Sequence, residues 1–264
     1  MLALVVNGSP HVSGLCYKLL SRITGGIKEA GGEVEFVQLA ELNIGPCRAC
    51  TPAPCWRAMK CNFSDDALKI REIFNKCDAL AFAAPVYFLS VNGLAKNFID
   101  RMRSYRKDTR PSLALTVAGG TGKGCITALQ EICRWMVLIG FAPIIAEPVT
   151  RYNFDEVYRL AKSWGRLLIN SIGKVPQLTT LNEKLLYFEK LPYMRYTVTD
   201  EILYLAKSTI EAISRKGRVE ETADLRVKVN EAEVRLRLGY WEEALRRAVE
   251  AQEESMYRFN KLSR

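Results

Sequence analysis

The chain has 264 residues, of which 48% are hydrophobic and 25% charged, with a formal net charge of +9 at pH 7. This is the composition of an ordinary globular protein, long enough for one large domain with a smaller second unit. No apolar stretch is long enough to span a bilayer and no secretory leader precedes the first strand, so we expect a cytoplasmic protein with no membrane partner. No zinc-finger or RNA-binding motif accompanies the basic charge, and we expect no nucleic-acid partner.

Apolar runs and helical spacing alternate through the first 172 residues. Strands are expected at residues 2–6, 33–39, 79–84, 113–118 and 143–147. Helices are expected at residues 15–30, 65–77, 93–107, 124–140 and 155–172. Continuous apolar strands separated by helices imply a parallel sheet that is covered on both faces. We therefore expect a doubly wound α/β fold with five strands, in which ligands bind beyond the carboxyl ends of the strands.

The loop after the first strand, residues 8–14, is rich in small residues. Such a loop lets the backbone wrap around an anion, and the N-terminus of the following helix adds attraction. Ser9 and Ser13 add hydroxyl donors. The loop matches neither the Walker A pattern nor the dinucleotide fingerprint, and an ordinary tight turn is the alternative. His11, the single histidine of the chain, is expected to be a loop residue.

Four cysteines lie within fifteen residues of the loop that follows the second strand, namely Cys47, Cys50, Cys55 and Cys61. Each thiol is a potential metal ligand, disulfide partner or oxidation target. A reducing compartment favours metal or redox use over structural disulfides. Three further cysteines, in later elements, are expected to be ordinary buried thiols: Cys77, Cys125 and Cys133.

An aromatic pair, Tyr87 and Phe88, follows directly after the third strand, where side chains normally become polar. Aromatic side chains at the carboxyl end of a strand indicate a flat ligand, and a hydrophobic plug beneath the next helix is the alternative. A Gly-rich loop follows the fourth strand at residues 119–124. Loops that follow parallel strands share one edge of the sheet, so we expect convergence there of residues 8–14, 45–61, 85–93 and 119–124.

The C-terminal part of the chain is expected to be helical, at residues 181–191, 200–216, 220–238 and 241–262. The last two helices form an apparent hairpin broken at Gly239 and Tyr240, and the sequence from Leu238 to Leu245 resembles half of a tetratricopeptide repeat. One copy of a repeat cannot close a solenoid core. We expect a helical cap on the α/β domain, with partner binding or oligomerisation as the alternative.

A series of motifs runs in order through residues 1–172, comprising Gly8-Ser9-Pro10, the cysteine loop after Pro46, Asp65-Asp66, Pro85-Val86-Tyr87-Phe88, Ser90, Gly93 and the helix from Lys96 to Arg101. Together these motifs resemble the NADPH-dependent FMN reductase family, and specifically its iron-sulfur flavoprotein branch. The resemblance implies a flavodoxin-like sheet with strand order 2-1-3-4-5. It divides the chain into an FMN-binding domain, residues 1–174, which contains the cysteine loop 45–64, and a helical extension, residues 175–264.

The resemblance also implies an FMN site. The phosphate would lie in the first loop, at Ser9, Ser13, Gly14 and Cys16. The isoalloxazine ring would lie against the two later loops, at Pro85, Val86, Tyr87, Phe88, Gly119 and Gly120. The chain departs from the family loop, which usually has Arg, Asn and Thr where this sequence has His11, Leu15 and Cys16. Each missing polar contact with the phosphate weakens binding by about 1 kcal/mol, and a missing charged one by more.

For the cysteine loop, the resemblance implies a 4Fe-4S cluster held by Cys47, Cys50, Cys55 and Cys61. The branch usually has two residues between the second and third cysteines, whereas this chain has four, including Pro52 and Pro54. Thiolates are soft ligands that suit iron-sulfur clusters and zinc over hard metals. Zinc is therefore the first alternative to the cluster, and empty thiols or disulfides are the second.

The function implied is that of an iron-sulfur flavoprotein, an oxidoreductase that relays electrons between a one-electron donor such as ferredoxin and a two-electron acceptor. No acid-base catalytic residue is expected for outer-sphere electron transfer. The alternatives are an NAD(P)H-dependent FMN or quinone reductase without a cluster, and a binding scaffold that has lost its flavin. The basic run at residues 101–110 could receive an acidic ferredoxin or an NADPH phosphate, or it could be a solvated helix end. We also expect a homo-oligomer.

Overall fold

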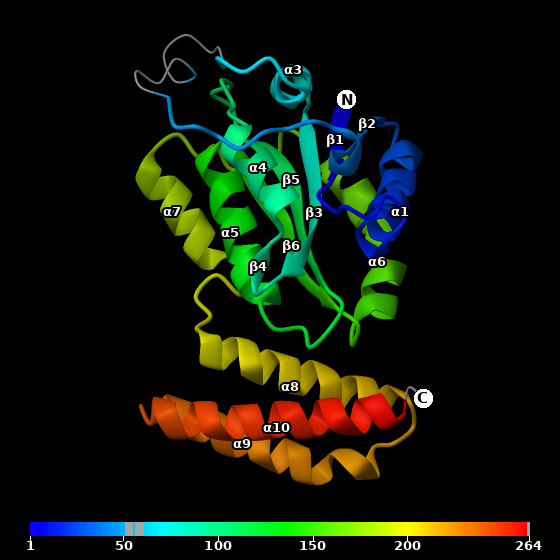
Figure 1. Ribbon diagram of the computed structural model, residues 1–264, viewed down its shortest axis with the longest axis vertical. Coiled ribbons are helices and arrows are strands. Elements are labelled where there is room, and N and C mark those ends of the chain that lie inside the picture. Colours follow the sequence, from blue (N-terminus) through cyan, green and yellow to red (C-terminus); the bar gives the residue numbers. More distant parts are fainter. Residues whose placement is uncertain (51–54, 56–60, 263–264) are drawn as a thin grey trace.

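Five parallel strands form the centre of the protein, in the order β2-β1-β3-β5-β6 (Figure 1). The computed structural model describes residues 1–50, 55 and 61–262. The parallel strands are β1 (Leu2–Asn7), β2 (Glu33–Gln38), β3 (Ala79–Tyr87), β5 (Arg110–Ala118) and β6 (Phe141–Thr150). A short strand, β4 (Ser90–Val91), pairs antiparallel with the end of β3. The predicted doubly wound, flavodoxin-like order is confirmed, and β4 is an addition to the five expected strands.

Helices cover both faces of this sheet, and further helices follow in the C-terminal part of the chain. In chain order the described helices are α1 (Leu15–Glu29), α3 (Ala67–Lys76), α4 (Gly93–Arg101), α5 (Cys125–Leu138), α6 (Phe154–Asn170), α7 (Leu181–Lys190), α8 (Val198–Arg215), α9 (Ala223–Arg237) and α10 (Trp241–Lys261), with short 3-10 turns at Leu39–Glu41 and Glu220–Thr222. Alternate side chains of β1 point to opposite faces of the sheet. Leu4 and Val6 pack with α3, α4 and α5, whereas Ala3 and Val5 pack with α1 and α6.

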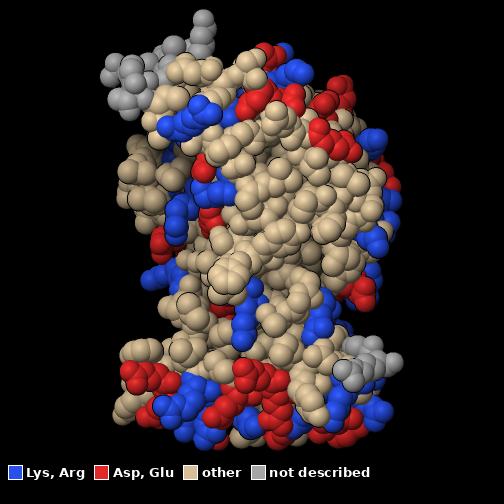
Figure 2. Space-filling model, in the orientation of Figure 1, with Lys and Arg blue, Asp and Glu red and all other residues tan. Residues whose placement is uncertain are grey.

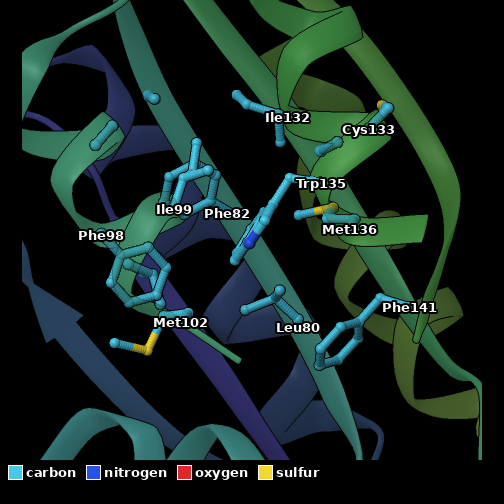
Figure 3. Packing of buried hydrophobic residues seen from close by; sticks show 14 of the residues in the cluster. Leu80, Phe82, Phe98, Ile99, Met102, Ile132, Cys133, Trp135, Met136 and Phe141 are labelled. Atoms are coloured by element: carbon cyan, nitrogen blue, oxygen red, sulfur yellow. The ribbon is translucent and has the colours of Figure 1, made fainter. Parts of the chain in front are cut away.

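Aromatic side chains hold α4 and α5 against β3. The rings of Phe82 and Phe98 stack with centroids 5.6 Å apart, and Trp135 of α5 lies 5.7 Å from Phe82 and 5.8 Å from Phe98. Figure 3 shows these side chains pointing toward one another from three elements. Full burial of such a side chain contributes about 1.5–3 kcal/mol. This packing fixes both helices, and their N-termini lie at the carboxyl edge of the sheet.

Helix α4 ends at Arg101, six residues before its predicted end near residue 107. The side chain of Asn75 explains the difference, because it accepts a hydrogen bond from the Tyr105 N–H at 2.7 Å and donates one to the Arg103 carbonyl at 3.1 Å. These two bonds take the place of helical backbone hydrogen bonds and attach residues 103–105 to α3. A contact between residues 30 positions apart is invisible to local helical spacing.

The C-terminal helices divide between two places. Helix α7 packs against α5, and its Phe188 joins the core of the α/β layer. Helices α8, α9 and α10 form a separate layer below the carboxyl edge of the sheet (Figure 1), with a hydrophobic core of their own. The predicted hairpin is present as α9 and α10, while the boundary after residue 174 stays a prediction. Among the described residues, no helix combines the length and apolar composition needed to cross a bilayer.

Candidate functional site at the carboxyl edge

The loop between β1 and α1 leaves the N-terminus of α1 open. Gly14 is the N-cap residue, no side chain caps the helix, and its first turn contains no acidic residue. Free N–H groups and the helix dipole make such a terminus attractive to an anion. The buried Ser9 shapes the loop: its N–H donates to Asn7 Oδ1 at 3.1 Å and its Oγ accepts from the His11 N–H at 3.0 Å. Ser13 is exposed and available to a ligand.

Cys16 lies in the first turn of α1, but its side chain does not face the loop. Its thiol is buried in the core between α1 and the sheet, and this burial raises the pKa of the thiol to about 12. The place of Cys16 in the phosphate site stays a prediction, and its buried thiol would take no part in it. Only its backbone N–H remains at the anion-binding end of the helix.

The loop that contains the aromatic pair is a tight hairpin between β3 and β4. Val86 pairs with Val91 and Tyr87 with Ser90, which leaves Phe88 and Leu89 as the two turn residues. Both have positive φ, +47° and +69°, a region that costs a bulky residue roughly 1–2 kcal/mol. The Phe88 side chain is 100% exposed. Phe88 is therefore no hydrophobic plug, and it is held in a strained turn where a flat ligand could reach it.

The Gly-rich loop after β5 meets this hairpin. Gly119 and Gly120 are exposed, and a Cβ at either would meet open space. Gly124, with φ +88°, is pressed against the turn, since a Cβ there would lie 2.3 Å from the Leu89 Cα. The first loop joins the same edge, because the Gly8 N–H donates to the Ala83 carbonyl of β3 at 2.8 Å. The three loops predicted to hold FMN are thus brought together.

Asn92 is a residue of this edge that the sequence reasoning did not single out. Its side chain is 3% exposed, and its Nδ2 donates to the Gly8 carbonyl at 3.0 Å. Its Oδ1 is buried without a hydrogen-bond partner among the described residues. An unpaired buried acceptor costs about 1–3 kcal/mol, and a hydroxyl or ring N–H of a ligand could satisfy it. This acceptor, the open α1 terminus and the aromatic turn fit a flat ring that carries a phosphate, as FMN does.

The cysteine loop does not join this edge. After β2 the chain crosses α4, where the Asn97 side chain donates to the Ile44 carbonyl at 3.3 Å and Arg101 donates to the Gly45 carbonyl at 2.8 Å. Because α4 runs back from the carboxyl edge, its last residue Arg101 lies toward the opposite end of the strands. Figure 1 shows the described ends of the loop, up to residue 50 and from residue 61, at that end. The predicted convergence is correct for three loops and wrong for the described part of this one, residues 45–50 and 61; residues 51–54 and 56–60 lie outside the described residues.

The four cysteines of the loop are free thiols in this structure. Cys47 is exposed, whereas Cys50, Cys55 and Cys61 are half-buried. Residues 51–54 and 56–60 lie outside the described residues, and within the described part no three Cys, His, Asp or Glu side chains form a group that could hold a metal. Soft thiols remain the right donor chemistry for iron-sulfur or zinc, and their assembly stays a prediction. The other predicted buried thiols, Cys77, Cys125 and Cys133, are indeed buried.

The two arginines at the ends of the basic run at residues 101–110 point inward. Arg101 and Arg110 are each only 2% exposed. Arg110 donates to the carbonyls of Phe74 and Cys77 at 2.8 and 3.0 Å, and Arg106 pairs with Asp108 at 2.5 Å. The expectations of a solvated helix end and of a partner surface are wrong for these two buried arginines: Arg110 bonds to the end of α3 and Arg101 to the ends of the cysteine loop.

Comparisons with known proteins agree with this arrangement. Residues 1–149 match the family model described as NADPH-dependent FMN reductase. An iron-sulfur flavoprotein of Archaeoglobus fulgidus is 29% identical over 161 residues, which are 58% of this chain and 78% of that protein. One of Methanocaldococcus jannaschii is 28% identical over 137 residues, 50% of this chain and 70% of that protein.

Solved structures show the same fold. A flavone reductase superposes with a TM-score of 0.51 at 17% identity, over 66% of this chain and 64% of that one. An NAD(P)H:quinone oxidoreductase from Methanothermobacter marburgensis superposes with a TM-score of 0.50 at 18% identity, over 64% and 96%.

Proposed function

Because the chain belongs to the NADPH-dependent FMN reductase family, we propose that this flavin-dependent oxidoreductase relays electrons between a one-electron donor and a two-electron acceptor. The observation that carries the proposal is the meeting of three loops at the carboxyl edge, beside an uncapped helix N-terminus and an exposed aromatic turn. The donor would be a ferredoxin-like protein or NAD(P)H. A reducing compartment, the cytoplasm, suits the free thiols.

The residues of the edge have separate tasks in this proposal. The hydroxyls of Ser9 and Ser13 and the N–H groups at Gly14 and Cys16 would hold the phosphate of FMN. The hairpin from Pro85 to Phe88 and the backbone at Gly119 and Gly120 would flank its ring. Bound FMN supplies the capacity to accept one or two electrons. The exposed Tyr87 and Phe88 leave the ring edge open to a partner.

The cysteine loop would supply one-electron transfer. A 4Fe-4S cluster on Cys47, Cys50, Cys55 and Cys61 is supported by the donor chemistry and by the relatives described as iron-sulfur flavoproteins. Cys61, which is bonded to Arg101, lies at the far end of α4 from the flavin edge. Electrons would therefore have to cross the length of α4 or pass to a neighbouring copy in a homo-oligomer. Zinc in place of the cluster would remove this step.

A second candidate is an NAD(P)H-dependent flavin or quinone reductase with zinc or bare thiols in the loop. The wholly exposed Phe88 favours it, because a flat acceptor such as a quinone could stack on that ring. Electrons would then enter and leave as pairs at the carboxyl edge alone.

Anaerobic purification followed by a visible spectrum and by assays of iron, acid-labile sulfide, zinc and flavin distinguishes these functions. We expect flavin with iron and sulfide, and we expect Cys50→Ser to lose the iron while it keeps the flavin, since the two sites are separate. Zinc with flavin would select the second candidate. Protein that neither contains nor rebinds flavin would contradict both.

A further inference from the structure

A buried ion pair closes the cysteine loop. The side chains of Arg101 and Asp65 are only 2% and 12% exposed. They form two parallel hydrogen bonds of 2.8 Å each, the bidentate geometry that suits a guanidinium and a carboxylate. Burial on its own would raise the pKa of Asp65, but hydrogen bonds from Arg101 and Gly45 hold that pKa below its ordinary value. The pair is therefore charged at neutral pH.

The same two side chains hold both ends of the loop. Arg101 Nη1 donates to the Gly45 carbonyl at 2.8 Å, and the Gly45 N–H donates to Asp65 Oδ2 at 3.2 Å. Gly45 lies two residues before Cys47, and Asp65 lies four residues after Cys61. The first and last cysteines are thus tethered to one guanidinium before any metal binds. Closing the loop in advance lowers the entropy that metal binding must overcome.

One bond of the guanidinium reaches a thiol. Arg101 Nη2 donates to Cys61 Sγ at 3.4 Å, beside its bond to Asp65. The guanidinium is also fixed by the Phe63 ring, which lies 5.2 Å from its central carbon. The helix end beneath it is held as well, because Arg71 Nη2 donates to the Arg101 carbonyl at 2.7 Å. A lysine has no planar fork and could not make these bonds together.

We propose that Arg101 is the positioning residue of the cysteine loop: it orients Cys61 as a ligand and, by donating to its sulfur, raises the reduction potential of the bound cluster. The inference rests on the proposed function, because it requires a redox-active cluster on these cysteines. Hydrogen bonds to ligand sulfurs stabilise the more negative, reduced form of a cluster. Asp65 acts through Arg101 by fixing the direction of its fork.

Arg101→Lys and Asp65→Asn test this role in the full-length protein, purified anaerobically. Lys96→Gln is the matched control, since it removes an ion pair with Asp100 from the same helix without touching the loop. Flavin content reports whether each variant folds. Iron and sulfide per flavin, the rate of iron loss to a chelator, and the midpoint potential of the cluster report the role of Arg101.

In Arg101→Lys we expect the reduced-to-oxidised ratio at a fixed potential to fall about tenfold, equivalent to a midpoint about 59 mV lower for one electron. In Asp65→Asn we expect iron to be lost several-fold faster, and in Lys96→Gln no change. If Arg101→Lys and Asp65→Asn both keep the wild-type midpoint potential and rate of iron loss, the role of Arg101 is overturned while the cluster itself stands. Wild-type protein with flavin but no iron would overturn the cluster itself and this inference with it.

Discussion

Glu147 is a carboxyl group without a cationic partner among the described residues. It projects from the edge strand β6 into a cavity of about 290 Å³ between β6, α6 and α8. The nearby Arg215 already binds Glu156 at 2.9 Å and the Tyr152 carbonyl at 2.7 Å. Burial, with a contribution from the charge of Glu156, raises the pKa of Glu147 from 4.5 to about 7. The folded protein therefore keeps a proton that the unfolded chain releases.

This proton makes stability depend on pH. The native state binds more protons than the unfolded state between pH 4.5 and 7, so the contribution of Glu147 to stability falls as pH rises through that window. We expect Glu147→Gln to abolish this decrease in stability with rising pH. At pH 8 the substitution should raise the free energy of unfolding by about 1–3 kcal/mol. Urea denaturation at pH 5 and pH 8 measures it. The control is Glu35→Gln, which changes an exposed carboxyl on the other edge strand. A Glu147→Gln variant that is no more stable than the wild type at pH 8 would contradict the prediction.

At the scale of residues, the place of the loop after β1 and the exposure of the aromatic pair at the carboxyl edge could be predicted, because both depend on local composition after a strand. The burial of Cys16 follows from its helical spacing with Leu19 and Leu20, which outweighs its place beside the loop. The role of Asn92 was not predictable, because its partner Gly8 lies 84 residues away.

Two neighbouring glycines of α1 have opposite surroundings. A Cβ on Gly26 would lie 1.9 Å from the Lys162 carbonyl of α6, whereas a Cβ on Gly25 would meet nothing within 4 Å. The helices cross at this point backbone to backbone, and Gly165 of α6 makes the matching approach to the Ile23 carbonyl. The position of α1, and with it the loop between β1 and α1, depends on this contact.

Alanine substitutions should separate the two glycines. We expect Gly26→Ala to lower the free energy of unfolding by about 1–3 kcal/mol, because the added methyl group forces α1 away from α6. Gly25→Ala should instead raise it by up to about 1 kcal/mol, because alanine has the higher helix propensity. Equilibrium denaturation of both variants is the measurement, and equal effects of the same sign would show that the close approach is unimportant.

At the scale of elements, helical spacing and apolar runs predicted nearly every helix and strand of the α/β layer. The early end of α4 and the path of the cysteine loop escaped prediction. Both are set by single side chains, Asn75 and Arg101, that bond to residues 30 or more positions away. Such contacts leave no periodic pattern in a sequence.

Helix α8 joins the two layers of the molecule. The Glu201 carboxylate is 5% exposed and caps α5, accepting hydrogen bonds from the Gly124 N–H, the Thr127 N–H at 3.3 Å and Thr127 Oγ1 at 3.0 Å. Leu205 packs beside it into a small cluster with Ala118 and Ile126. Figure 2 shows mixed acidic and basic groups on the helical layer. The buried contacts, more than surface charge, hold α8 in place.

Removing the Glu201 carboxylate should weaken the contact between α8 and the N-terminus of α5. Glu201→Ala leaves the Gly124 N–H without its acceptor, which costs about 1–3 kcal/mol, and we expect a lower melting temperature with faster amide hydrogen exchange in α8 and at residues 119–124. Glu211→Ala, an exposed change on the same helix, should leave both unaltered. Exchange in α8 as slow as in the wild type would show that Glu201 does not hold the layers together.

The attachment of the cysteine loop at Gly45 and Asp65 frees its interior to change in length. Doubling the length of a loop raises the entropic cost of closing it by only about 0.6 kcal/mol. The extra residues between Cys50 and Cys55 therefore lower the stability of the fold very little. The loops at the carboxyl edge touch one another and have no such freedom. The fold therefore constrains the cysteine spacing of this loop only weakly, whereas the Asp65–Arg101 pair must stay in place to hold its two ends.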